Sequence, residues 1–99
     1  MKEILDHINK VFENRIRLGL MSILVVNDKV EFNTLKETLN LTDGNLASHI
    51  TVLEKNQYVS VNKKFVGKKP LTTYSATTAG RRALSKHLDA LEQLIKKTQ

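Results

Sequence analysis

The sequence has 99 residues, 40% hydrophobic and 26% charged, with a formal net charge of +6, which suits one small globular domain and not a disordered tail. Its longest apolar stretch, residues 18–26, is interrupted by Gly19 and Ser22, and no basic start precedes an apolar block, so we expect a cytoplasmic protein without a membrane partner. Because cysteine is absent, disulfides, thiolate metal sites and thiol nucleophiles are excluded.

Two helices are predicted at the start of the chain. Between Met1 and about Phe12, apolar residues recur at steps of three and four, which places them on one face of an amphipathic helix. A second helix is predicted from Asn14 to about Val26. Apolar side chains lie almost all round this second helix, so we expect it in the centre of the core.

A helix-turn-helix is predicted over residues 33–56. After a short edge strand at 30–32, a third helix can begin at Asn33 or Thr34, which are both good N-cap residues. A tight turn then leads to a fourth helix, which Thr42 can cap. The spacing i, i+4, i+7 predicts its buried residues, which are Leu46, Ile50 and Leu53.

A basic hairpin is predicted over residues 58–76. Its first strand alternates apolar and polar side chains, which is typical of a half-buried strand. The alternating apolar residues are Val59, Val61 and Phe65. Residues 71–76, rich in threonine and with a tyrosine, form the second strand, and residues 66–70 form the basic tip between them.

A last helix is predicted over residues 78–97, with Thr77 or Thr78 as its N-cap. Its apolar residues follow coiled-coil-like spacings of four, three and four, and they are Leu84, Leu88, Leu91 and Ile95. The order of elements is that of a mostly helical α+β fold, a winged helix-turn-helix with a two-stranded wing. No linker or composition shift divides the chain, so we predict a single domain over residues 1–99.

Charge is distributed unevenly along the chain. Residues 1–60 hold seven Lys or Arg against eight Asp or Glu, whereas residues 61–99 hold nine against two. No carboxylate lies between Glu54 and Asp89, which favours a polyanion as partner. The three histidines lie far apart and no phosphate-binding glycine loop or nucleophile motif is present, so we expect no enzyme, no metal site and no cofactor.

Four segments together resemble the small stand-alone winged-helix transcriptional regulators related to the MarR and ArsR families. They are FNTLK at 32–36, LTDGNLASHI at 41–50, LEK at 53–55 and TTYSATTAGR at 72–81. The resemblance covers about residues 12–85. It implies a dimeric DNA-binding regulator, with the fourth helix in the major groove and the wing on the flanking backbone or minor groove.

Two positions depart from the pattern of these relatives. The recognition helix of relatives often ends with glycine, whereas Gln57 stands here before Tyr58, so Asn56 or Gln57 must end the helix without glycine's freedom at positive φ. Ala76 stands where leucine often closes the strand after the wing, which removes some core volume.

The outer face of the fourth helix carries short polar side chains that can approach base edges. Asn45 can pair with adenine, Ser48 can contact a base or a phosphate, and His49 can donate to guanine or a phosphate. The wing lysines suit phosphates, although lysine also protects hairpin edges from aggregation. The candidate DNA contacts are Asp43, Gly44, Asn45, Ser48, His49, Thr51, Val52, Lys63, Lys64, Gly67, Lys68, Lys69 and Arg81, and Arg15, Arg17 and Arg82 are further phosphate candidates.

The terminal helices, 1–12 and 78–97, carry more leucine and isoleucine than a core of this size needs, which favours a homodimer. The candidate interface residues are Ile4, Leu5, Ile8, Leu84, Leu88, Leu91 and Ile95. In the simpler alternative, the last helix folds back on its own domain. We predict a sequence-specific regulator of double-stranded DNA, a homodimeric repressor that binds a palindromic operator. The alternative function is a winged-helix module that binds protein partners and not DNA.

Overall fold

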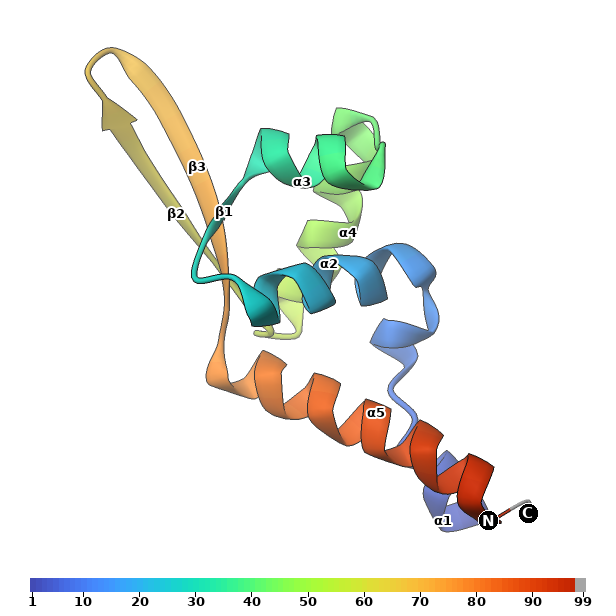
Figure 1. Ribbon diagram of the computed structural model, residues 1–99. Coiled ribbons are helices and arrows are strands. Elements are labelled where there is room, and N and C mark those ends of the chain that lie inside the picture. Colours follow the sequence, from blue (N-terminus) through green and yellow to red (C-terminus); the bar gives the residue numbers. More distant parts are fainter. Residues whose placement is uncertain (98–99) are drawn as a thin grey trace.

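Helix α2 (Arg15–Val26) lies at the centre of the fold, as its apolar character predicts (Figure 1). In the computed structural model, which describes residues 1–97, α2 contacts α3, α4, α5 and β3. Asn14 begins the helix, because its side-chain oxygen accepts hydrogen bonds from the backbone N–H groups of Ile16 and Arg17. The fully buried residues of α2 are Leu20, Met21 and Leu24.

The N-terminal segment is not the single helix that its periodicity predicts. Helix α1 covers only Lys2–Leu5, and a 3-10 helix, η1, follows at Lys10–Glu13. Asn9 separates them with an extended backbone (φ −92°, ψ 118°), and its side chain accepts from the backbone N–H of Val11. The prediction of one continuous helix was wrong because Asn9 starts a new element by capping its first turn.

Helix α3 (Phe32–Leu39) begins slightly earlier than predicted, directly after strand β1 (Val30–Glu31). Asn33 and Thr34 therefore lie inside the helix, and no side chain among the described residues caps it. The prediction of either residue as the N-cap was wrong, since the strand itself leads into the first turn.

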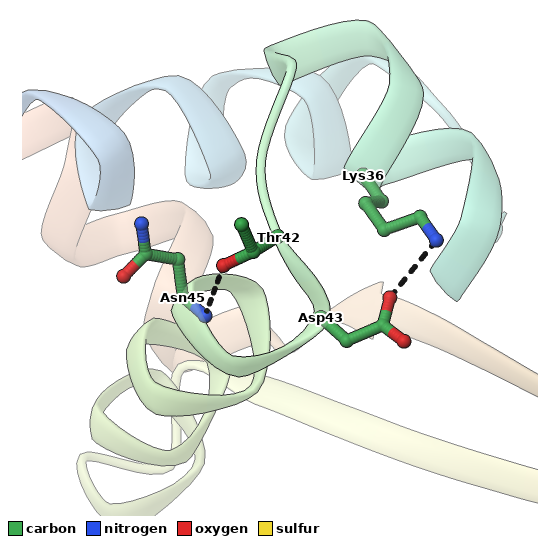
Figure 2. A network of polar contacts seen from close by, with 4 residues as sticks. All are labelled: Lys36, Thr42, Asp43 and Asn45. Atoms are coloured by element: carbon green, nitrogen blue, oxygen red, sulfur yellow. Dashed lines mark hydrogen bonds and ion pairs between the residues drawn. The ribbon is translucent and has the colours of Figure 1, made fainter.

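Helix α4 (Asp43–Lys55) begins and ends as the sequence predicts. The Thr42 hydroxyl accepts a hydrogen bond of 3.1 Å from the backbone N–H of Asn45 (Figure 2). After the helix, Gln57 takes φ 62°, the left-handed conformation that glycine usually supplies. The predicted stripe of Leu46, Ile50 and Leu53 is buried.

In the described part of the chain, β1, β2 (Val59–Val66) and β3 (Lys69–Ala76) form an antiparallel sheet in the order β1-β3-β2. β2 and β3 make the wing, and Val66 pairs with Lys69, so the connection is a two-residue turn of Gly67 and Lys68. Gly67 takes φ +63°, which a tight hairpin turn of this type requires at its first position.

The wing extends beyond the body of the protein (Figure 1). Val59, at its base, is buried, but Val61 and Phe65 are 37% and 73% exposed. The prediction of a half-buried strand was therefore wrong beyond its first residue. The alternation of side chains is present, but the body of the protein does not extend beneath the outer half of the hairpin.

Helix α5 (Thr78–Lys97) lies on the other side of α2 from α3 and contacts α1 (Figure 1). Thr77 is its cap, since the hydroxyl accepts from the backbone N–H of Gly80 and donates to the backbone oxygen of Gln57. The face buried in the chain comprises Gly80, Leu84, His87 and Ala90. Within residues 1–97, no helix combines the length and apolar character that a membrane span needs.

Candidate nucleic-acid interface

The outer face of α4 is short, polar and open to solvent. Asn45, Ser48 and Thr51 are exposed, and His49 and Val52 are half-buried. A Cβ added at Gly44, in the first turn, would meet no other side chain or element of the described structure within 4 Å, apart from its chain neighbours. The structure therefore brings the predicted contacts of α4 together on one side, where a close approach to another molecule is sterically open.

An ion pair joins the first turn of α4 to α3 (Figure 2). Lys36 Nζ lies 2.9 Å from the Asp43 carboxylate, whose side chain is 74% exposed. The carboxylate also lies at the positive end of the α4 dipole. Asp43, predicted as a DNA contact, thus has a partner within the chain, although an exposed pair of this kind contributes little to stability.

Arg17 of α2 reaches across to His49 of α4. Its Nε donates to the backbone oxygen of Val11 at 2.8 Å, and Nη1 lies 3.2 Å from His49 Nδ1. Burial, and then the charge of Arg17, lower the pKa of His49 below its usual value. Sequence reasoning proposed both residues for DNA contact but missed their hydrogen bond, for which the sequence contains no local signal.

The wing lysines occupy both faces of the hairpin and its tip. Lys63 lies on the same face of the sheet as Tyr74, whereas Lys64 and Lys69 lie on the opposite face, and Lys68 is in the turn. All four side chains and Gly67 are exposed. The wing therefore carries positive charge all round its outer half.

Arg81 does not join these groups. Its Nη1 donates to the backbone oxygen of Val25 at 2.7 Å, in the last turn of α2, where a cation is favourable to the helix dipole. The start of α5 lies across α2 from α3 (Figure 1). The structure thus gives Arg81 a partner inside the fold, away from the outer face of α4.

The candidate dimer residues divide into two groups. Ile4 and Leu84 are buried within the chain itself, at 8% and 4% exposure. Ile8 is half-buried. The exposed members are Leu5 (53%), Leu88 (48%), Leu91 (37%) and Ile95 (61%). We call these four residues the terminal apolar patch.

A polar cluster that sequence reasoning missed connects the N-terminal segment to α5 and to Tyr58, the residue before the wing. The Asn9 backbone N–H donates to Nδ1 of buried His87, and the Asn9 side-chain amide donates to the Tyr58 hydroxyl, both at 3.0 Å. The Phe12 ring lies against both the Tyr58 and the His87 rings. His87 therefore has a structural role in positioning η1.

A helix-turn-helix of α3 and α4, followed by a two-stranded wing, defines a winged helix domain. The chain matches the family model described as winged helix DNA-binding domain over residues 16–95, and it belongs to that family. Its membership confirms the predicted fold and the resemblance to winged-helix transcriptional regulators.

Known proteins resemble the whole chain. An uncharacterised protein of Methanocaldococcus jannaschii is 36% identical over 87 residues, which cover 88% of this chain and 95% of that protein. The structure of a transcriptional regulator homologue from Pyrococcus horikoshii OT3 is 34% identical with a TM-score of 0.85, covering 99% and 95% of the two chains. S. aureus MepR, solved in complex with DNA, shares the fold at 13% identity, with a TM-score of 0.76 and coverage of 100% and 82%.

Proposed function

We propose that this protein is a homodimeric transcriptional repressor that binds a palindromic operator, with α4 in the major groove and the wing on the flanking backbone or minor groove. The observation that carries the proposal is the location of the two candidate contact surfaces. The start of α4 and the tip of the wing both lie on the side of α2 away from α5 (Figure 1). One duplex can therefore contact a polar helix face and a cationic hairpin at once.

The charge distribution supports DNA over a protein partner. The acid-free interval between Glu54 and Asp89 contains the whole wing, whose four lysines are exposed. A wing that binds protein has no reason to lack carboxylates. A wing that contacts phosphates does, because carboxylates and phosphates repel each other. The proposed interface does not include Arg81, because its guanidinium is hydrogen-bonded to α2.

The terminal apolar patch supports the dimer. It lies on α1 and α5, which contact each other on the far side of α2 from α3 (Figure 1). A two-fold axis there leaves both copies of α4 free for successive major grooves, about 34 Å apart. Such a dimer reads a palindrome, and a protein bound over a promoter represses by occupying it.

Fluorescence anisotropy tests the function directly. Duplexes that bind the protein are first selected from a random-sequence pool. Three labelled duplexes of equal length are then titrated with the protein at two salt concentrations: a selected duplex, one from its own upstream region, and an unrelated one. We expect selection of a palindrome, tight and salt-sensitive binding to it, and weaker binding to the unrelated duplex. No binding to any duplex at low salt would favour the protein-interaction module instead.

Replacing Asn45 by alanine tests base reading by α4. The variant leaves the cap intact, because Thr42 binds the backbone N–H of Asn45. We expect a loss of about 1 to 3 kcal/mol on the selected duplex and little change on the unrelated one. Asn33→Ala, the same change at an exposed position of α3, is the control. Equal losses on both duplexes would contradict base reading by Asn45.

Replacing Lys68 and Lys69 by alanine tests phosphate contact by the wing. We expect weaker binding to every duplex and a salt dependence of log Kd reduced by about two per protomer. The control is Lys96→Ala with Lys97→Ala, which removes the same charge at exposed sites on α5. If both double variants bind alike, net charge and not the wing determines affinity.

A further inference from the structure

Arg17 is fixed in place at the edge of the proposed interface. Its backbone N–H donates to the Asn14 cap, and its Nε donates to the Val11 oxygen at 2.8 Å. The remaining side of the guanidinium meets His49 Nδ1 at 3.2 Å. The backbone of Arg17 and the Nε end of its planar guanidinium are thus both held, so Nη1 points toward His49 in a defined direction.

The chemistry of this contact determines where the imidazole proton lies. A guanidinium has five N–H donors, no acceptor, and stays protonated. Nδ1 of His49 must therefore accept, which requires a neutral ring with its proton on Nε2. No side-chain nitrogen or oxygen of residues 1–97 is buried without a partner, and the described bond of His49 uses Nδ1, so Nε2 reaches the surface of α4.

The electrostatic surroundings favour the same neutral ring. Burial and the Arg17 charge both lower the pKa of His49, which favours the neutral ring. One turn away on α4, the neighbouring side chains are uncharged, and they are Asn45, Leu46, Val52 and Leu53. The elements packed on α4 are α2, α3 and β2. Among their described residues, Arg17 is the charged group that contributes to the lowering of the His49 pKa.

We propose that Arg17 is a positioning residue for sequence recognition: by hydrogen-bonding Nδ1 it makes His49 a neutral Nε2–H donor that reads a purine N7 or guanine O6 in the major groove. The inference rests on the proposed DNA-binding function. A neutral donor distinguishes bases, whereas a cationic histidine binds phosphates of any sequence and binds them better as the pH falls.

The tautomer is tested in the free protein by two-bond ¹H–¹⁵N NMR of the histidine rings. We expect the Nε2–H form at His49 in the wild type. Arg17→Met, which removes the donor, should raise the His49 pKa and mix the tautomers. Arg15→Met is the matched control, since it removes the same charge from an exposed neighbour in α2. A wild-type ring that is cationic at pH 7, or protonated on Nδ1, overturns the inference.

Base reading is tested by placing 7-deazaguanine or 7-deazaadenine, which lack N7, or 2-aminopurine, which lacks the guanine O6, at each purine of the selected duplex. At one position per half-site we expect the wild type and Arg15→Met to lose about fivefold in affinity, the value of a single hydrogen bond. His49→Phe should show no such loss there. Arg17→Met should show a smaller loss at that position. Among these proteins, only Arg17→Met should bind several-fold more tightly at pH 6 than at pH 7.5, because its His49 ring gains a proton on binding DNA.

A second variant guards against a folding defect in Arg17→Met. Arg17→Lys keeps the charge but cannot hold the Val11 oxygen and His49 together, so it should discriminate less than the wild type with an unchanged melting temperature. Equal discrimination in the Arg17 and Arg15 variants overturns the inference while the proposed function stands. A wild type that binds no duplex overturns the proposed function and this inference together, even if the Nε2–H form is observed.

Discussion

Replacing Gly80 by alanine is expected to lower the free energy of unfolding by about 2 to 3 kcal/mol, although alanine is the better helix former. Gly80 is buried in the first turn of α5. A Cβ there would overlap the backbone oxygen of Tyr58 and come within 2.7 Å of Met21 Cε. The Tyr58 oxygen cannot move aside by a rotamer change, since it belongs to the backbone and accepts a hydrogen bond from Thr77 N–H.

The relative magnitudes determine the sign of this effect. Alanine gains about 1 kcal/mol over glycine in a helix, while overpacking against backbone costs about 3 kcal/mol or more. Gly19→Ala in α2 is the control, because its Cβ would lie 3.4 Å from the flexible end of Leu39. That variant should be unchanged or up to about 1 kcal/mol more stable in urea unfolding. A Gly80→Ala protein as stable as the control would show that the junction between α4, the wing and α5 can shift.

Local signals predicted most of the elements that carry the site. Thr42 caps α4 as the sequence predicts, and Thr77, one of two predicted candidates, caps α5, because a cap requires only one side chain and the next three residues. Gln57 ends α4 in a left-handed conformation, as the position demands in the absence of glycine. The predicted stripe on α4 is buried as expected, because residues spaced by three and four positions lie on the same face of a helix.

Long-range contacts account for the errors. The helix predicted over residues 1–12 is divided at Asn9, which binds His87 and Tyr58, 78 and 49 residues away. The same His87 helps to determine which face of α5 is buried, together with the close approach at Gly80. Apolar periodicity does not register a histidine or a glycine as core. It therefore predicted the apolar line through Leu88, which was assigned to a dimer interface, but not the His87 face that the chain itself buries.

The site was predictable in its residue types but not in its pairings. An outward polar face on α4 follows from the buried stripe, so Asn45 and Ser48 were identified correctly as exposed. Which carbonyl or ring an arginine meets depends on how helices cross. The hydrogen bonds from Arg17 to His49 and from Arg81 to Val25 could for that reason not be read from the sequence.

Replacing Leu88 by glutamate is expected to convert the proposed dimer into a monomer. Leu88 is 48% exposed in the single chain and lies one turn from Leu91 on α5. In a two-fold interface built on the terminal apolar patch, the variant would bury a carboxylate from each protomer, and an unpaired buried charge costs several kcal/mol. Since half of Leu88 is already exposed, the fold of the monomer should be retained.

Light scattering at micromolar concentration measures the expected change. Gln93→Glu is the control, because it adds the same charge to α5 at an exposed position on another face, and it should stay dimeric. The Leu88→Glu monomer should bind a single half-site with about half the salt dependence of the wild type on a full palindrome, because it brings one wing and one α4 instead of two. A wild type that is monomeric at this concentration, or a Leu88→Glu protein as dimeric as the control, would exclude this patch as the interface. Loss of operator binding without loss of the dimer would instead show that Leu88 on α5 affects the DNA-binding face and not dimer formation.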